Sequence, residues 1–402
     1  NNTGAEATDS NGLTAFGTDG FTVGSSAGTN ANGQTYVGWN WKAAGANPAK
    51  TYVVKVVSDG GNKYRLDDFA ANAVTLELSE GGTFTFDQSD SSNNGHPLRF
   101  STTSNGTHAG GSIYTTGVVV SGTPGQAGAK TTITVAASAP TLYYFCTVHS
   151  GMGGQANTPT TNSFTNLDGS IQSNISPNST SKFSIVSYTG NGSNPRTVGH
   201  GLGVTPAMII IKERSAAKSW YVYHKSLGNN TELYLNGTDA APNSTSAWDT
   251  TSPTATVFTI NNAGVNDSND TYIAYCFADV QGFSKFGSYA GNNSSNGGFH
   301  YTGFKPAFIM IKRTDSAGDW RIYDDKRFRA GGPNNKLNYL EPNTSDAEAD
   351  TDSGGAWDML SNGFKFYTSD AAINGSGTYI SVSYTHLRAH ETPEHLVCRL
   401  LL

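Results

Sequence analysis

The sequence GVTPAMIIIK at residues 203–212 decides the fold of most of this chain, because it returns as GFKPAFIMIK at residues 303–312. A tryptophan and a tyrosine follow at the same distance in both copies: Trp220 and Tyr223, then Trp320 and Tyr323. Short apolar runs of this kind, bounded by Gly, Pro, Asn and Ser, are typical of strands in all-β proteins. The constant offset predicts two copies of one β-sandwich module.

Shorter motifs repeat in the same order and indicate the extent of each copy. Ala-Trp-Asp occurs at 247–249 and again at 356–358, and Thr-Tyr-Ile occurs at 271–273 and again at 378–380. We therefore expect one module over residues 180–281 and a second, truncated module over residues 282–381.

The remaining chain divides into segments of different character. TYVGWNWKA at 35–43 matches the closing strand of a module, so we expect residues 1–46 to be the C-terminal part of a further, truncated repeat. Residues 47–157 lack the repeated motifs and are expected to form a separate inserted domain. Residues 158–179 are rich in Thr, Asn and Ser, which predicts an extended, solvated linker.

The last segment, residues 382–402, breaks the repeat. It has no glycine, is rich in leucine and carries three of the nine histidines. It resembles a peptide that recurs at the ends of unrelated translated assemblies, where adapter or vector sequence has been read as coding, so we interpret it as a non-native tail. The alternatives are an amphipathic helix and a metal pair formed by His386 and His390, one helical turn apart.

Composition narrows the possible functions. A net charge of −6 with only 14% charged residues provides no basic stripe, so nucleic acid is not an expected partner. The chain has no apolar run approaching the roughly 18 residues of a membrane span. Three cysteines do not make a disulfide framework.

One loop carries specific chemistry. Residues 146–152 read CTVHSGM after an aromatic run, which brings Cys146, His149 and Met152 onto one turn. A second imidazole comes from His96 in the segment NGHPLRF at 94–100. Two imidazoles, one thiolate and a weak thioether are the ligands of a blue-copper site.

On these residues the segment 47–157 resembles the cupredoxins, with the ligand-loop spacing of the amicyanin type. The resemblance implies a Greek-key β-sandwich that binds one type 1 copper ion for one-electron transfer. It also implies that His96 and His149 are imidazole ligands, that Cys146 is the thiolate and that Met152 is the axial ligand.

The segment departs from the family in the groups that contact the ligands. Cupredoxins usually have an N–H after the first histidine that bonds the cysteine sulfur, and Pro97 has none. Many related loops also have proline just before the second histidine. Val148 stands at this position and keeps its N–H, so it is the expected partial substitute. The alternatives are a copper site of altered potential and a scaffold that binds nothing.

No enzyme is predicted. The histidines outside the tail are isolated rather than paired as His-x-His, and no nucleophile elbow, phosphate loop or zinc-protease helix occurs. Trp220, Trp248, Trp320 and Trp357 are interpreted as core residues, with sugar-stacking platforms as the alternative.

The repeated modules resemble a domain in structural proteins of marine tailed phages. The resemblance is carried by VGHGLGVTP at 198–206, MIIIK at 208–212 and DSNDTYIAY at 267–275. It implies lectin-like sandwiches in a tail-fibre-like virion appendage, with other virion proteins and a host-cell glycan or receptor as partners and a homotrimer as the assembly. The alternative is a secreted or cell-surface blue-copper electron-transfer protein in which the repeats are anchors.

Overall fold

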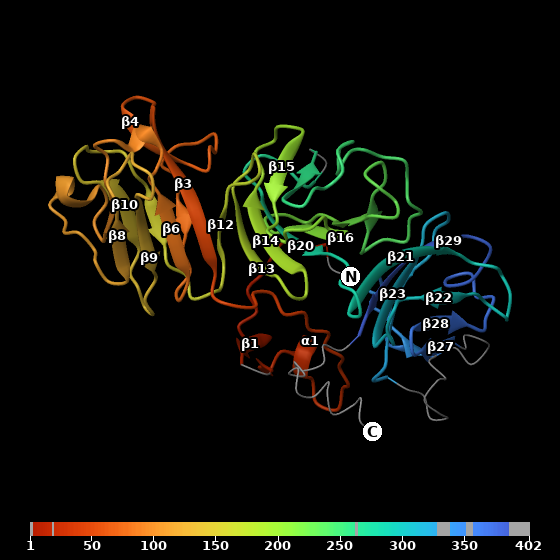
Figure 1. Ribbon diagram of the computed structural model, residues 1–402. Helices are drawn as coiled ribbons and strands as arrows, with labels where there is room; N and C mark the ends of the chain where they lie inside the picture. Colours follow the sequence, from red (N-terminus) through yellow and green to blue (C-terminus); the bar gives the residue numbers. More distant parts are fainter. Residues whose placement is uncertain (1–2, 18–19, 262–263, 328–337, 351–356, 386–402) are drawn as a thin grey trace, which may run out of the picture.

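The computed structural model describes residues 3–17, 20–261, 264–327, 338–350 and 357–385. Within them almost all regular structure is β, which confirms the all-β prediction. Three β bodies lie in a row (Figure 1), with the N-terminal segment against the middle and last of them. That segment contains a hairpin of β1 (Leu13–Phe16) with β2 (Phe21–Val23), followed by the short helix α1 (Ala27–Asn30).

The middle body is the first repeat. Its strands are β12 (Phe164–Asn166), β13 (Ser173–Asn178), β14 (Phe183–Thr189), β15 (Arg196–Gly199), β16 (Met208–Glu213), β17 (Trp220–His224), β18 (Leu233–Tyr234), β19 (Val257–Ile260) and β20 (Thr271–Phe277). Seven of them form one sheet in the order β12-β13-β14-β20-β16-β17-β18, and β15 pairs with β19. The apolar run of the opening motif lies in β16, next to the central strand β20.

The last body repeats this arrangement. Its strands are β21 (Ser284–Ala290), β22 (Phe299–Tyr301), β23 (Phe308–Arg313), β24 (Trp320–Asp324), β25 (Asn338–Tyr339), β26 (Ala349–Asp350), β27 (Trp357–Leu360), β28 (Gly363–Phe366) and β29 (Thr378–Tyr384). The order β21-β29-β23-β24 corresponds to β14-β20-β16-β17 of the first repeat. The second run of the motif occupies β23, beside β29, so the predicted repetition is confirmed.

Matching side chains perform matching tasks in the two repeats. Tyr188 stacks on Tyr272 with ring centroids 5.1 Å apart, and Tyr289 stacks on Tyr379 at 5.0 Å. The hydroxyls of Tyr188 and Tyr289 each donate to a backbone carbonyl at 2.7 Å, that of Val265 and that of Ile373. The register of the repeat therefore extends to individual hydrogen bonds.

Both faces of the central strands are covered, because their side chains alternate between two cores. Ile209 and Ile211 point into the core of the first repeat, whereas Met208 joins a cluster shared with the second repeat. Phe308 belongs to this shared cluster, and Trp41 packs on its ring with centroids 5.4 Å apart. The N-terminal segment therefore helps to close the interface between the repeats.

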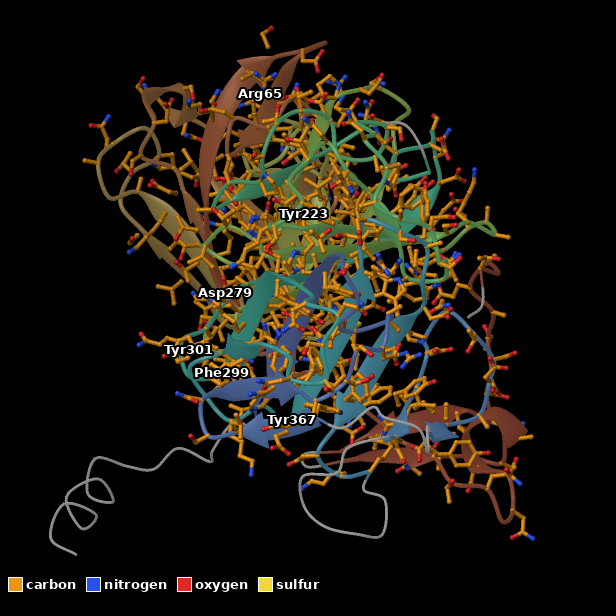
Figure 2. All side chains as sticks on the ribbon, turned by 90° about the vertical axis from the view of Figure 1, so that its right-hand side faces the viewer. Arg65, Tyr223, Asp279, Phe299, Tyr301 and Tyr367 are labelled. Carbon is orange, nitrogen blue, oxygen red and sulfur yellow. The ribbon has the colours of Figure 1, made fainter. Side chains whose placement is uncertain are left out.

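Three of the four tryptophans that we predicted to be core residues are buried. Trp248, Trp320 and Trp357 are each 1% exposed, so these three are core residues and offer no face to a sugar. Trp220 is partly buried. The exposed aromatic side chains of the second repeat are instead Phe299, Tyr301 and Tyr367, which lie along the same part of that repeat (Figure 2).

The first body of the row in Figure 1 comprises the remaining strands. They are β3 (Ala49–Ser58), β4 (Asn62–Leu66), β5 (Leu76–Glu77), β6 (Thr83–Asp87), β7 (Leu98–Ser101), β8 (Val118–Ser121), β9 (Lys130–Thr134), β10 (Leu142–Cys146) and β11 (Gln155–Asn157). They form two sheets, in the orders β4-β3-β6-β9-β8 and β5-β11-β10-β7. Two pairings, β3 with β6 and β11 with β5, are parallel.

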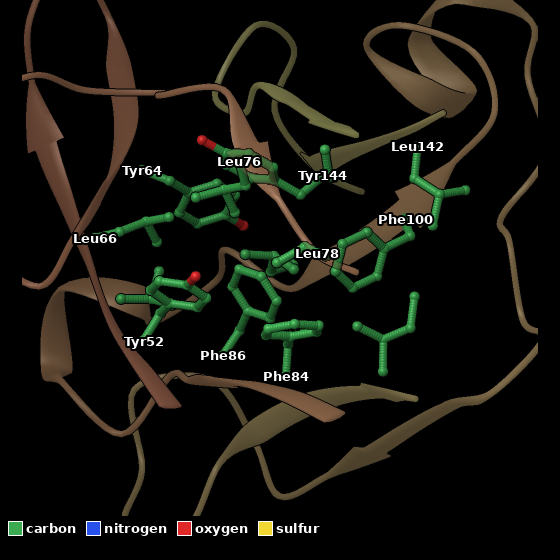
Figure 3. Packing of buried hydrophobic residues seen from close by; sticks show 14 of the residues in the cluster. Tyr52, Tyr64, Leu66, Leu76, Leu78, Phe84, Phe86, Phe100, Leu142 and Tyr144 are labelled. Atoms are coloured by element: carbon green, nitrogen blue, oxygen red, sulfur yellow. The ribbon is translucent and has the colours of Figure 1, made fainter. Parts of the chain in front are cut away.

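An aromatic core lies between these two sheets (Figure 3). Phe84 and Phe86 alternate with polar residues on β6 and are both fully buried. The ring of Phe86 contacts those of Tyr52 and Phe100, each with centroids 5.4 Å apart. Side chains of this size each contribute roughly 1.5–3 kcal/mol on burial, so the sandwich has a substantial core of its own.

Two predicted segments differ from the structure. Residues 158–179 are not a solvated linker, because they supply β12 and β13 to the seven-stranded sheet and bury Leu167, Ile171 and Ile175. The prediction was wrong because it relied on the polar composition of the segment and gave no weight to these three apolar side chains, which face inward. The expected non-native tail begins inside a strand, because Val382, Ser383 and Tyr384 complete β29 and are buried; its origin stays a prediction. Residues 386–402, with His386 and His390, lie outside the described residues.

The N-terminal segment also differs in detail. Residues 35–43 form no strand, although a closing strand was expected there. The chain is held at this point by Lys42, whose carbonyl accepts a hydrogen bond from the amide of Asn178 at 3.1 Å. The backbone just before the first sandwich is therefore held by a side chain at the end of β13 in the middle body.

Candidate metal centre

Strand pairing brings two separate ligands to one end of the four-stranded sheet. Cys146 is the last residue of β10 and pairs with Leu98 at the start of β7. His96 lies two residues before Leu98, so it reaches the same edge. His149 follows Cys146 on the loop that leaves β10.

The three side chains converge. The Sγ of Cys146 lies 3.9 Å from Nδ1 of His96 and 3.8 Å from Nδ1 of His149. The two imidazole rings have centroids 4.4 Å apart. Metal–sulfur and metal–nitrogen bonds of about 2.3 and 2.0 Å, at tetrahedral to trigonal angles, separate sulfur from nitrogen by about 3.5–3.7 Å. The donor spacing therefore fits one shared metal ion.

Exposure increases across the cluster. Cys146 is fully buried, His96 is partly buried and His149 is exposed. The sulfur is thus shielded from water, and one imidazole reaches the surface. This arrangement protects the sulfur and leaves an edge of the site accessible to a partner or to solvent.

Met152, the fourth predicted ligand, lies at the end of the same loop. Its side chain is fully buried within the aromatic core of the sandwich. Its carbonyl accepts a hydrogen bond from the backbone N–H of Tyr64 at 2.9 Å, which ties the loop to β4. Met152 therefore lies on the buried side of the loop, within the core of the sandwich.

The sulfur receives a hydrogen bond despite the proline. The N–H of His149 donates to Sγ of Cys146 at 3.4 Å, so the donor is His149 rather than the expected Val148. Pro97 contributes its carbonyl, which accepts from the N–H of Thr147 at 3.2 Å. The loop therefore compensates internally for the donor that Pro97 lacks.

The backbone at His96 is fixed by two donors. The hydroxyl of Tyr64 and the side-chain amide of Gln88 both donate to the carbonyl of His96 at 2.8 Å. The other end of the Gln88 amide accepts from the N–H of Leu98 at 3.1 Å. Gln88 thus clamps the turn on both sides of Pro97 and orients the imidazole.

A second clamp holds the loop from outside. The Oδ1 of Asn105 accepts from the N–H of Gly151 at 2.7 Å, and Nε2 of His108 lies 2.9 Å from the carbonyl of Cys146. Between them Gly106 lies on the ring of Phe145, where a Cβ would come within 2.4 Å of ring carbons. Only glycine fits this close approach.

The electrostatics favour the ligand form of the imidazole. Burial lowers the pKa of His96, and neighbouring His149 lowers it further. Burial raises the pKa of the Tyr64 hydroxyl, and the nearby Cys146 adds to the effect. A neutral imidazole is the form that binds metal, so the site holds His96 ready for binding.

The sequence did not reveal the supporting residues. Tyr64, Gln88 and His108 lie 32, 8 and 38 residues from the groups that they contact. His108 is isolated in the sequence, and only the pairing of β7 with β10 brings it near Cys146. Among the described residues, one other group of at least three potential ligands occurs, formed by Glu213, Asp267 and Asp270.

Comparison with known proteins assigns the family. Residues 1–81 and 155–386 match the family described as "Domain of unknown function (DUF7483)", and the chain belongs to this family. No curated protein and no solved structure matches the chain. In the described residues, no helix has the length and apolar character needed to cross a membrane.

The matched residues leave out 82–154, and this stretch contains all four predicted ligands. Family membership therefore describes the repeats and the segments next to them, and it says nothing about the metal centre. The resemblances to cupredoxins and to tailed-phage proteins stay predictions.

Proposed function

We propose that the sandwich 47–157 binds one copper ion through His96, Cys146 and His149, with Met152 as a weak axial ligand. The observation that supports this most is the convergence of one thiol sulfur and two imidazole nitrogens at 3.8–3.9 Å. A thiolate with imidazoles and a thioether is a donor set that selects copper among the common metals. When bound, copper supplies one-electron redox chemistry.

The residues of the chain divide the remaining tasks. Cys146 supplies the negative charge that compensates the metal, and His149 donates its N–H to the sulfur, which is one of the interactions that tune a potential. Tyr64 and Gln88 orient His96 through its carbonyl. The buried side of the site excludes water from the sulfur.

For the whole chain we propose a structural role in a virion appendage, where the metal stabilises the sandwich that binds it. The repeated sandwiches and the phage-like resemblance support this reading. The competing proposal is an electron-transfer protein of the cell surface. Reversible reduction with a docking partner would favour electron transfer, whereas host binding by the copper-depleted chain would favour the appendage.

Copper binding is tested on the full chain titrated with Cu(II). We expect one equivalent to bind and to produce an intense thiolate-to-copper absorption in the visible range. Cys146→Ser should abolish the absorption, whereas Cys276→Ala, at a fully buried cysteine outside the site, should retain it. A colourless protein without stoichiometric copper would refute the proposal.

One surface favours a second role, in glycan binding. Phe299, Tyr301 and Tyr367 are 46, 67 and 39% exposed and lie along the same part of the second repeat (Figure 2). Exposed aromatic faces stack on the apolar faces of sugars. Retention on immobilised host polysaccharide should be lost in Tyr301→Ala and kept in Cys146→Ser; equal retention of both would argue against this role.

A further inference from the structure

We propose that the first repeat binds a calcium ion between Glu213, Asp267 and Asp270, and that Arg313 supplies the corresponding positive charge in the second repeat. The site is separate from the copper-like centre and does not depend on it. It follows from comparing equivalent positions of the two repeats.

Three carboxylates meet at the end of β16. Glu213 is the last residue of this strand and pairs with Tyr272 of β20. Asp267 and Asp270 lie on the loop that leads into β20. One carboxylate oxygen of each residue lies within 4.8 Å of the other two.

The carboxylate of Glu213 is only partly compensated inside the protein, by the charges of Lys218 and Lys212. The residue is fully buried, and its Oε2 has no hydrogen-bond partner. Ser215 lies 3.4 Å from Oε1 of Glu213 and 3.1 Å from Oδ1 of Asp270, but its hydroxyl has one proton for two carboxylates. A buried unpaired charge is costly, so the cluster is suited to bind a cation from solution.

Resident cations do not fill this role. Lys218 approaches Asp267 at 3.7 Å from a half-exposed position, and Lys212 donates to the carbonyls of Glu213 and Ala216. Within the described part of the chain, neither Glu213 nor Asp270 forms an ion pair. Burial raises the pKa of Glu213, and the charge of Asp270 raises it further, which agrees with crowded negative charge.

The second repeat shows what occupies this place. Arg313 ends β23 and pairs with Tyr379, as Glu213 pairs with Tyr272. The motif VNDSNDTY at 265–272 corresponds to INGSGTY at 373–379, so Asp267 and Asp270 become Gly375 and Gly377.

The Arg313 guanidinium fills the space beside these glycines. Its Nη2 donates to the carbonyl of Ser376 at 3.1 Å, and its Nε donates to Asp315 at 2.9 Å. Both nitrogens lie 2.8 Å from the position that a Cβ on Gly377 would take. The second repeat thus has a built-in cation where the first has carboxylates, and the first must obtain its cation from solution.

Calcium suits the donors of the first repeat. All three are carboxylates, and the hydroxyl of Ser215 adds a further hard oxygen. Calcium accepts six to eight oxygens in flexible geometry, whereas magnesium demands a near-ideal octahedron and retains water. A site shared between a strand end and a loop provides irregular geometry, which favours the larger ion.

The test uses the full chain carrying Cys146→Ser, freed of metal by chelation and titrated with CaCl2. We expect calorimetry to show one binding event and the unfolding midpoint to rise. Glu213→Gln should lose both responses, whereas Asp249→Asn, at an acidic residue outside the cluster, should keep them. No response of the parent chain, an unchanged response of Glu213→Gln, or an equal response to MgCl2 would overturn the calcium assignment.

A grafted variant keeps the test independent of folding defects. Glu213→Arg with Ser215→Asp, Asp267→Gly and Asp270→Gly transfers the second repeat's arrangement, in which Arg313 pairs with Asp315, to the first. We expect this variant to match the calcium-loaded parent in unfolding midpoint and to ignore calcium. A variant that folds, by circular dichroism, and still gains stability from calcium would refute the equivalence of Arg313 and the ion.

Discussion

The first sandwich and the first repeat each bring three potential metal ligands together at the end of a buried strand, but the ligand atoms differ in chemical type. Cys146 ends β10 and meets two imidazoles, whereas Glu213 ends β16 and meets two carboxylates. The thiol and imidazoles suit a soft or borderline metal, and the carboxylates suit a hard one. If both proposals hold, the end of a buried strand presents donors for a soft or borderline ion in one body and for a hard ion in the other.

The largest expected effect is a double dissociation between the two sites. Cys146→Ser should lose the copper absorption and keep the stabilisation by calcium, and Glu213→Gln should do the reverse. At free metal about 100 times the Kd, binding stabilises the fold by about 2.7 kcal/mol. Absorption spectra and unfolding midpoints of both variants measure this; loss of both responses in one variant would mean that the sites are coupled.

The next effect concerns the cation built into the second repeat. Arg313→Gln should lower the free energy of unfolding by about 1–3 kcal/mol, because hydrogen bonds to charged groups are lost. The loss should be the same with and without calcium. Denaturant unfolding measures it, with Lys285→Gln on an exposed part of β21 as the control. A loss that calcium restores would contradict the assignment of Arg313.

Glu213 provides a prediction about pH. Its folded-state pKa is raised, so the folded protein binds more protons than the unfolded chain above the ordinary carboxyl pKa of about 4.5. The metal-free parent should therefore lose stability as pH rises through this window. Glu213→Gln removes the effect and should be more stable than the parent at pH 7, by about 1 kcal/mol.

The comparison of the two metal-free proteins is made by urea unfolding at several pH values. Their difference should shrink toward zero at pH 4, where the carboxyl of the parent is protonated. Equal stabilities at pH 7 would show that Glu213 carries no uncompensated charge.

The smallest effect tests the support of His96. Tyr64→Phe removes one of the two donors to the His96 carbonyl, and Gln88 remains. The free energy of unfolding should fall by about 1 kcal/mol. Copper should still bind, with a shifted absorption maximum; complete loss of the absorption would mean that Tyr64 does more than orient the imidazole.

The two sites also differ in how well the sequence predicts them. Cys146, His149 and Met152 share one loop, so their spacing is visible, and His96 stands in a recognisable turn. Glu213 lies 54 residues from Asp267, and only the register of β16 against β20 brings them together. Spacing reveals ligands on one loop, whereas ligands on paired strands require the sheet.

The fold shows the same division. The repeats were predictable because apolar runs, tyrosines and tryptophans recur at a fixed offset. The segment 158–179 was not, since Ile171 and Ile175 stand alone among polar residues. Ile175 becomes core when β13 pairs with β14, and Ile171 does so beside Val198. Residues 35–43 carry a strand-like motif, but Trp39 and Trp41 pack between the repeats without joining a sheet.

The hydrogen bond between Asn178 and the carbonyl of Lys42 has a mechanical consequence. It joins the chain before the first sandwich to the chain after it, and Trp39 extends the connection by donating to Asp324 of the second repeat. A force applied to the N-terminal segment would thus pass to the repeats through these two hydrogen bonds. The sandwich would then carry less of the force. Cys146, His96 and His149 would keep their spacing while the rest of the chain bears the load.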